Sequence, residues 1–484
     1  MSEQSPEPSG SDPFSALPPE LAEILRQLTS TNADPAMQQM LGQFGIDKLD
    51  PATLAVIGQQ VNALMNASDE GAIDLANATD LARKTVAAAG DELVSAPRQH
   101  AVDQALAVAR LWLDAVTEFA AHDIEEGAWS RAEWVEATMT TWASLVEPIA
   151  EGVTAAMTAA MTAQLEQFDQ LTEGGIPEGL LPDGVLPAGM DPRAMLGAIQ
   201  PMVARMGSAM FSMQLGQAVG TLAGDVLSGT DVGLPLVPTR TVAMVPVNID
   251  AFASGLDIDA EEVLLYLAVR ESARARLFAA VPWLGPGVTA AVRDYASDIR
   301  IDTEGIERTL SDIDLSDPGA MVAVQEKLQG QLFTPQPSPA QQAALTRLET
   351  LLALVEGWVD VVTDRATRST LPHAAALGEV IRRRRGTGGP AEKTFASLVG
   401  LQLRPRRLRD AANLWAALED RLGADRRDDA WRHPDLAPTG ADLDDVLGYV
   451  DRVQGGSTPD EFDSALNALL DAEDRSDPGE GSAG

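Results

Sequence analysis

Apolar residues recur at three- and four-residue spacing along most of this chain, and that spacing restricts its fold more than any other feature. Such spacing turns one side of a helix towards the protein interior. It is clearest in two stretches, Leu106, Ala109, Leu113, Val116 and Ala120, followed by Val135, Met139, Trp142, Leu145 and Ile149. Runs of Val and Thr that predict strands are confined to residues 233–250, where we expect two short strands or a hairpin. The sequence therefore predicts a mainly α (α+β) protein.

Composition divides the 484 residues into five parts. Residues 1–18 are rich in Ser, Pro and Glu and predict a disordered leader. A helical N-terminal region over 19–173 precedes a Pro- and Gly-rich connection over 174–195, because proline removes a backbone donor and fixes φ. Residues 196–440 form the predicted main region, and 441–484 an acidic tail with a short helix.

The main region contains a series of predicted helices. One begins at Asp259, where Glu262 completes a capping box, and ends before Pro282. Pro- and Gly-rich joins separate further helices over 287–310, 318–331, 339–370, 373–385, 391–402 and 406–423. Upstream, the glycines of one helical stripe, Gly216, Gly220 and Gly224, predict close approach of another backbone.

Charge and residue counts exclude several classes of function. With 72 acidic and 35 basic residues, the formal net charge of -37 disfavours binding to nucleic acid or to an anionic membrane. The absence of cysteine excludes disulfides and thiolate metal sites. No apolar stretch is long enough to insert into a membrane, and the N-terminus lacks the pattern of a secretory signal. We expect a cytoplasmic protein.

One predicted buried helix carries the pattern Arg270, Glu271, Ser272, Ala273, Arg274. Positions 270 and 274 share a helix face. In metallopeptidases with the HExxH pattern, histidines at these two positions bind zinc, and the intervening glutamate acts as general base. Here arginine occupies both histidine positions.

Several segments together resemble the actinobacterial zincin-like metallopeptidase type 2 family, whose members are described as hydrolases or zinc-dependent metalloproteases. These segments are WSRAEWVEAT (129–138), FSMQLGQAVGTLAGDVL (211–227), GLPLVP (233–238), VRESARARLFAAVPWL (269–284), EGWVDVV (356–362), GGPAEKTFASLVGLQLRPRRLRDAANLW (388–415) and WRHPDLAPT (431–439). The resemblance implies a zincin-like fold over most of the chain. It places Glu271 at the general-base position and Glu356 at the position of a third metal ligand, with zinc as the cofactor of active relatives.

The two arginines argue against that cofactor in this chain. A guanidinium has no lone pair for a metal and stays protonated, so Arg270 and Arg274 would repel zinc. We therefore expect no cofactor and a non-catalytic family member that binds or scaffolds a protein or peptide partner. The alternative is an active peptidase or hydrolase with carboxylate metal ligands. For Glu271, a salt-bridge hub, extended through Glu356, is favoured over a surviving general base, because Arg274 lies at i+3.

Two other groups of charged residues are candidates for ligand binding. Arg382, Arg383, Arg384 and Arg385 form a locally basic stretch that is a candidate anion site, although pairing with the acidic surplus of the chain is the favoured interpretation. Asp294 and Asp298, at i and i+4, have the spacing to hold a hard cation, but such pairs are usually a solvated face.

Overall fold

The computed structural model describes residues 72–172, 192–297, 338–386 and 407–455, together with Thr394 and Leu398. Within the full chain, one compact unit comprises Met1–Ala78 with Ala150–Gln214, and a second comprises Thr79–Ile149 with Leu215–Gly484. The leader, the helix expected over 318–331 and residues 456–484 lie outside the described residues, and of the helix expected over 391–402 only Thr394 and Leu398 are described, both helical. The boundaries expected from composition remain predictions.

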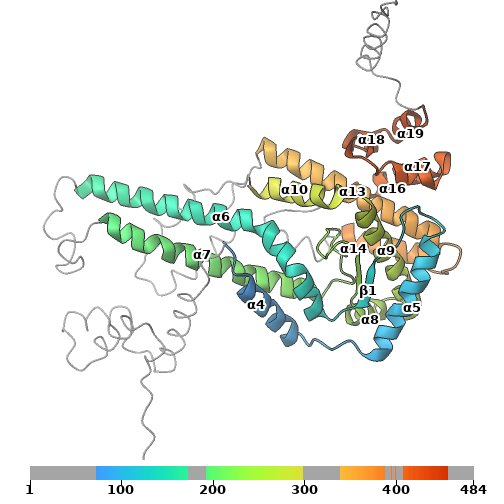
Figure 1. The fold of residues 1–484 in the computed structure, drawn as a ribbon, viewed down its shortest axis with the longest axis horizontal. Coiled ribbons are helices and arrows are strands. Elements are labelled where there is room, and N and C mark those ends of the chain that lie inside the picture. The colour runs from blue at the N-terminus through green and yellow to red at the C-terminus, as the bar shows by residue number, and fades with distance from the viewer. Residues whose placement is uncertain are drawn as a thin grey trace, which may run out of the picture. The chain divides into compact units, whose positions relative to one another are not determined.

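The described elements are nearly all helices (Figure 1). In chain order they are α4 (Leu75–Ala88), α5 (Ala96–Leu113), β1 (Glu125–Ala128), α6 (Arg131–Thr172), α7 (Pro192–Ala223), β2 (Thr241–Met244), α8 (Pro246–Ser254), α9 (Ala260–Ala280), α10 (Leu284–Ser297), α13 (Pro339–Thr367), α14 (Ala374–Gly386), α16 (Leu408–Leu422), α17 (Ala424–Asp429), the 3-10 turn η2 (Pro434–Leu436), α18 (Gly440–Asp444) and α19 (Val446–Gly455). The mainly helical prediction is confirmed.

Local signals account for where several helices begin. α13 opens with a capping box in which Ser338 and Gln341 exchange side-chain and backbone hydrogen bonds. At the start of α9, Asp259 caps the helix by accepting from the backbone N–H of Glu261. The expected pairing with Glu262 is wrong, because the Glu262 carboxylate instead accepts from the backbone of His373 at 2.7 Å.

The β segment differs from the expected hairpin. Within 233–250, only Thr241–Met244 forms a strand. It pairs in parallel with Glu125–Ala128, which lies in the N-terminal region that was predicted to be helical. Residues 233–238 contain two prolines that cannot donate to a ladder, and Pro246 takes the first turn of α8. The small sheet is thus built from two segments distant in sequence, which local periodicity does not reveal.

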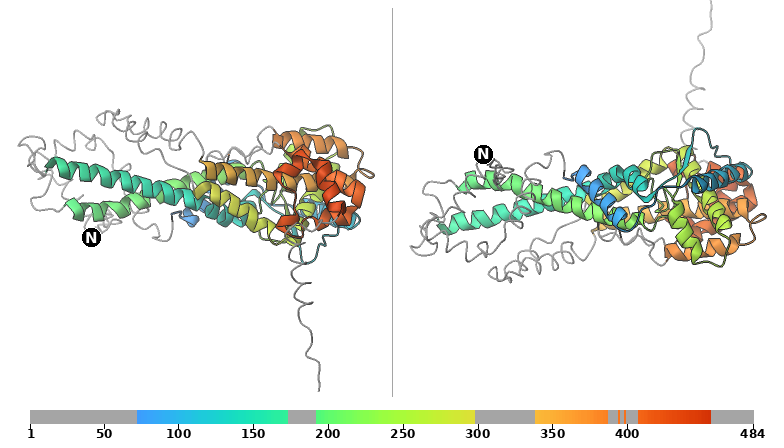
Figure 2. Two further views of the ribbon diagram at one scale, coloured as in Figure 1. Left: turned by 90° about the horizontal axis from the view of Figure 1, so that it is seen from above. Right: turned by 90° about the horizontal axis from the view of Figure 1, so that it is seen from below.

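Helix α9 lies at the centre of the second unit. Every residue from Tyr266 to Phe278 is buried, and α5, α8, α13, α14 and β2 all pack against the helix. Helix α13 in turn packs against α10 and α16 (Figures 1 and 2). The centre of this unit therefore contains the charged pattern 270–274.

Two glycines allow close packing of helices in the second unit. A Cβ at Gly220 of α7 would lie 2.8 Å from the carbonyl oxygen of Ala82 in α4, so the close approach predicted from the glycine stripe is confirmed at this position. A Cβ at Gly357 would lie 2.7 Å from Cβ of Ala411 and from the backbone nitrogen of Ala412. Only a residue without a side chain lets α13 and α16 meet this closely.

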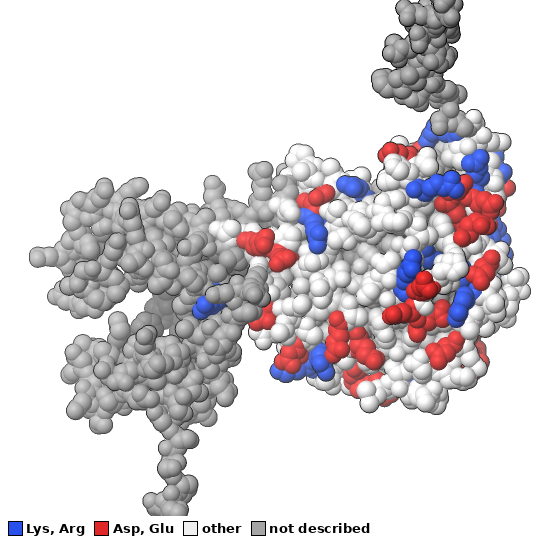
Figure 3. All heavy atoms as spheres, in the orientation of Figure 1, with Lys and Arg blue, Asp and Glu red and all other residues white. Residues whose placement is uncertain are grey.

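The exterior of the described residues carries charges of both signs. Lys, Arg, Asp and Glu side chains lie interspersed over the face drawn in Figure 3. Among these residues, no single helix has the length and apolar character needed to cross a membrane. The sharply bent pair α9 and α10, which meet at 91°, reaches those limits only when the two helices are taken together.

Candidate functional site

Helix α9 buries charged side chains that water would otherwise solvate. The exposed fractions of Arg270, Glu271 and Arg274 are 4%, 1% and 2%. Burial of an unpaired ion is strongly unfavourable, so each of these groups requires partners of opposite charge or hydrogen-bonding groups. Neighbouring elements supply both.

Glu271 receives four hydrogen bonds. Oε2 accepts from Oγ of Ser228 at 2.7 Å, from Oγ1 of Thr230 at 2.8 Å and from Nη1 of Arg274 at 2.9 Å. Oε1 accepts from the backbone nitrogen of Thr230 at 2.9 Å. Each carboxylate oxygen has two lone pairs, so the three donors saturate Oε2, whereas Oε1 accepts one bond.

Glu356 extends from α13 into the same region and meets three guanidiniums. Arg274 binds it through two nitrogens, with Nε 3.0 Å from Oε1 and Nη2 3.3 Å from Oε2. Arg270 donates from Nη2 at 3.1 Å, and Nη1 of Arg385 lies 2.6 Å from Oε1. Charge-assisted bonds of this forked kind are directional and strong.

Two further acidic residues balance the remaining positive charge. Asp360, one turn beyond Glu356 on α13, pairs with Arg270, and Asp231 accepts from Nη1 of Arg384 at 2.8 Å. The backbone oxygen of Asp231 also accepts from Arg385 at 2.9 Å. We call the eight residues the arginine–carboxylate cluster: Arg270, Arg274, Arg384 and Arg385 with Asp231, Glu271, Glu356 and Asp360. It contains equal numbers of positive and negative groups.

The pKa values of the acidic groups reflect these contacts. Burial alone would raise the pKa of Glu356, but Arg274, Arg385 and Arg270 lower it to about 2. Burial likewise opposes ionisation of Asp231, whose pKa Arg384 and Arg385 lower to about 2. For Glu271 burial dominates and raises the pKa, against the opposing effects of Arg274, Ser228 and Thr230.

The loop between α7 and β2 carries Ser228, Thr230 and Asp231 to the cluster. Helix α6 anchors this loop, because Nε1 of Trp134 donates to the carbonyl oxygen of Gly229 at 3.3 Å and Oγ1 of Thr141 donates to that of Leu236 at 2.9 Å. The segment WSRAEWVEAT, which contains Trp134, therefore helps to position a loop that lies far from it in sequence.

The basic stretch of α14 is paired within the chain. Arg384 and Arg385 belong to the cluster. Arg382 and Arg383 bind Glu379 at 3.3 and 2.9 Å, and Nη1 of Arg382 also lies 3.7 Å from Asp360 of the cluster. Each of the four arginines that were candidates for anion binding thus has a carboxylate partner within the chain, and the anion site remains a prediction.

The other candidate side chains lie apart from the cluster. Asp294 lies 3.9 Å from Arg347, and its proposed partner Asp298 is outside the described residues. Nδ1 of His373 contacts Glu262 at 2.9 Å, at the start of α9.

Sequence reasoning did not identify Ser228, Thr230, Asp231 and Asp360 as site residues. A signal existed only for Asp360, which follows Glu356 at i+4 and so lies on the same face of α13. The other three lie in a loop whose path to α9 no local pattern specifies. Arg385 was identified as a basic residue but not as a partner of Glu356.

Comparison with known proteins decides the family. The model of the zincin-like metallopeptidase family matches residues 73–450, which include the whole cluster. The chain belongs to this family. A solved structure described as "a putative hydrolase with a novel fold", from Chloroflexus aurantiacus, is similar to the zincin-like chain with a TM-score of 0.50 and 17% identity, over 80% of this chain and all of that one. At that identity the likeness concerns the fold alone. No curated protein matches the sequence.

The residues at the zincin position do not fit zinc. Catalytic zinc sites use three protein ligands, mostly histidines with a carboxylate. At 270 and 274 this member has guanidiniums, and a third guanidinium, that of Arg385, contacts the remaining acid, Glu356. Over the described part of the chain, no three His, Asp or Glu side chains are grouped so that they could hold a metal ion.

Proposed function

We propose that this chain is a non-catalytic member of the zincin-like family that binds a protein or peptide. The observation that carries the proposal is the position of Arg274, whose guanidinium contacts both Glu271 and Glu356 at 2.9 and 3.0 Å. In the family resemblance these two acids are the general base and the third metal ligand. Here a fixed positive side chain joins them.

The hydrogen bonds of Glu271 also argue against a catalytic role. A general base needs an oxygen lone pair available to the water whose proton it removes. Three donors fill Oε2, and Oε1, which accepts from the backbone of Thr230, belongs to a side chain that is only 1% exposed, so water does not reach its remaining lone pair. A metal-free hydrolase based on this glutamate would first have to break that network.

The competing proposal is a hydrolase that binds its metal through carboxylates such as Glu271 and Glu356. It requires Arg274 to leave both acids and Arg270 and Arg385 to leave Glu356, which would deprive buried cations of their partners. No contact among the described residues favours that rearrangement. We retain it as the outcome against which the proposal is tested.

The test is the zinc content of the purified protein without a histidine tag, measured by inductively coupled plasma mass spectrometry. One sample is measured as purified and one after zinc addition and dialysis. We expect less than about a tenth of an equivalent in both, because structural and catalytic zinc normally survive such handling. Near-stoichiometric zinc that is lost on Glu356→Ala would overturn the proposal and identify a carboxylate site.

A partner of the proposed kind would meet an acidic protein. The net charge of -37 favours partners that are neutral or basic overall and disfavours nucleic acid. A cytoplasmic location remains part of the proposal. Its test is fractionation of cells that express the untagged chain.

A further inference from the structure

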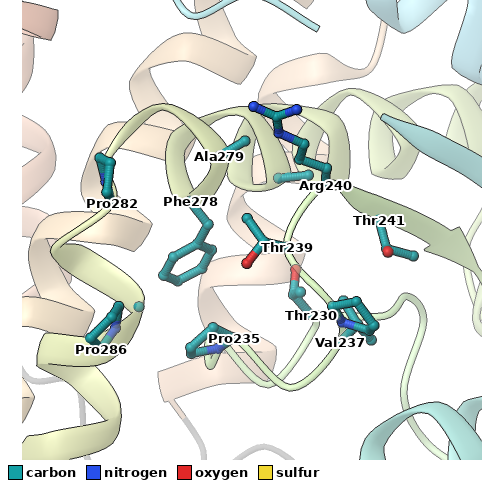
Figure 4. A pocket seen from close by; sticks show the side chains of 13 residues that line it. Thr230, Pro235, Val237, Thr239, Arg240, Thr241, Phe278, Ala279, Pro282 and Pro286 are labelled. Atoms are coloured by element: carbon teal, nitrogen blue, oxygen red, sulfur yellow. The ribbon is translucent and has the colours of Figure 1, made fainter. Parts of the chain in front are cut away.

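A cavity of about 310 Å³ lies next to the arginine–carboxylate cluster (Figure 4). The end of α9, the first turn of α10 and the loop before β2 enclose it. Thr230 belongs to both places, since it lines the cavity and donates to Glu271. A ligand in this cavity would therefore lie beside the position of the family's active site.

One part of the cavity wall is formed by Phe278 and several prolines, and is apolar and poor in backbone donors. Phe278 and Pro235 face each other across it, with Pro286 beside them, and Pro238 and Pro282 complete the lining (Figure 4). Proline has no N–H, so these walls cannot pair with an extended peptide backbone as the edge of a sheet would. Recognition on this side of the cavity must therefore use an apolar group.

One end of the cavity is positive and carries free hydroxyls. Arg240 lies at the rim, 50% exposed, with a single carboxylate neighbour, Asp123, at 3.5 Å. Thr239 and Thr241 line the same end, and their hydroxyls make no hydrogen bond within the described residues. Across the cavity from Arg240, the first turn of α10 also lines it through Gly285, and there the helix dipole favours negative charge (Figure 4).

The backbone at Arg240 is strained. Its φ of +71° lies in the left-handed region, which residues with a Cβ rarely adopt. Its carbonyl oxygen accepts from the backbone nitrogen of Glu125 at 2.8 Å, at the start of the sheet. Glycine would meet that backbone requirement without strain, and strained residues of this kind cluster at ligand contacts.

We infer that this cavity binds an apolar group that bears a carboxylate, in the form of the C-terminal residue of a peptide. Phe278 and the prolines enclose the side chain, and Arg240 pairs with the terminal carboxylate. The volume is near the lower end of ligand pockets, about 300–1,000 Å³, and suits one residue rather than a long segment. The inference deepens the proposed binding function and rests on it.

The experiment is isothermal titration of the full, tag-free chain with three probes. The first is N-acetyl-Ala-Ala-Phe with a free C-terminal carboxylate, the second is the same peptide as its C-terminal amide, and the third is 3-phenylpropionate. We expect the peptide acid to bind and the amide to bind at least tenfold more weakly, because only the acid pairs with Arg240. Binding of phenylpropionate as tight as that of the peptide acid would identify a small carboxylic acid as the source of the same chemistry.

Three variants connect binding to the cavity. Arg240→Gln should weaken the peptide acid at least tenfold and leave the amide unchanged. Arg421→Gln is the matched control, since Arg421 is 52% exposed and also pairs with one exposed carboxylate, Asp451 at 2.7 Å. Gly285→Leu fills the cavity, where a Cβ would meet Pro235 at an ordinary 3.8 Å, and should abolish binding while the thermal unfolding midpoint is kept.

Equal binding of acid and amide, or no binding of any probe at millimolar concentration, would overturn the inference. Equal loss in Arg240→Gln and Arg421→Gln would overturn it as well. Failure of this inference can be told apart from failure of the proposed function. For this, the recovered peptide is examined by mass spectrometry and the zinc content of the same sample is measured. Cleaved peptide would contradict the non-catalytic role, whereas intact peptide without binding would contradict the cavity ligand alone.

Discussion

Nη1 of Arg385 lies 2.6 Å from Oε1 of Glu356, so the last turn of α14 reaches the acid that α13 presents to α9. Arg385 lies outside the pattern 270–274, yet it contacts the same carboxylate as both arginines of that pattern. The site therefore differs from a zinc site at more than positions 270 and 274. Helix α14 adds the guanidinium of Arg385 to the partners of Glu356.

Histidines at positions 270 and 274 alone should not create zinc binding. In Arg270→His/Arg274→His the two imidazoles gain the spacing of a zinc pair, but Arg385 still occupies Glu356. We expect less than about a tenth of an equivalent of zinc in this double variant, and higher zinc content when Arg385→Leu is added. Stoichiometric zinc in the double variant would show that Arg385 yields the carboxylate freely.

Removal of Arg274 should destabilise the fold. Arg274→Met keeps much of the side-chain volume but leaves Glu271 and Glu356 without their shared partner. Breaking a buried pair in this way costs about 3–5 kcal/mol of unfolding free energy, measured by urea denaturation. The exposed pair in Arg421→Gln should change it by less than about 1 kcal/mol. Equal effects of the two variants would contradict the role of the cluster.

The cluster should make stability depend on pH in the acid range. The pKa of Glu356 falls from an ordinary 4.5 to about 2 on folding, so its contribution is complete above about 4.5 and is lost as the pH falls towards 2. A shift of this size corresponds to about 3 kcal/mol. Glu271 has the opposite sign, because its pKa is raised in the folded chain and protonation favours the folded state.

The pH dependence of Glu356 can be isolated with Glu356→Gln. At pH 7 the variant should unfold at lower urea concentration than wild type, because its three guanidiniums lose their carboxylate. The difference between the two proteins should shrink between pH 4.5 and pH 2, where wild-type Glu356 becomes neutral as well. A difference that stays constant over this range would contradict the lowered pKa.

Gly357 should tolerate no side chain. In Gly357→Ala the new Cβ would lie 2.7 Å from the backbone nitrogen of Ala412, so α13 and α16 must separate. We expect a loss of about 1–3 kcal/mol in unfolding free energy. In Gly152→Ala, within α6, no atom lies within 4 Å of the new Cβ, and helix propensity predicts a gain of up to about 1 kcal/mol. Similar effects of the two variants would be inconsistent with close helix packing.

Much of the helical architecture could be predicted from local sequence. α13 and α16 follow the apolar periodicity, and α9 lies between its Asp259 cap and Pro282. The sheet could not be predicted, because β2 pairs with β1, more than a hundred residues earlier. The sequence signal against a hairpin was the presence of two prolines in 233–238, because proline cannot donate to a strand ladder.

The sequence by itself determined that positions 270 and 274 hold no metal ligand, since a guanidinium has no lone pair to give. It also determined that Glu271 has a positive neighbour at i+3, because helix geometry fixes that spacing. Only the tertiary structure decided that Arg385, Asp231 and Thr230 complete the cluster, and that a cavity with Arg240 at its rim lies beside it. Contacts between distant segments depend on how helices and loops pack, and local periodicity does not specify that packing.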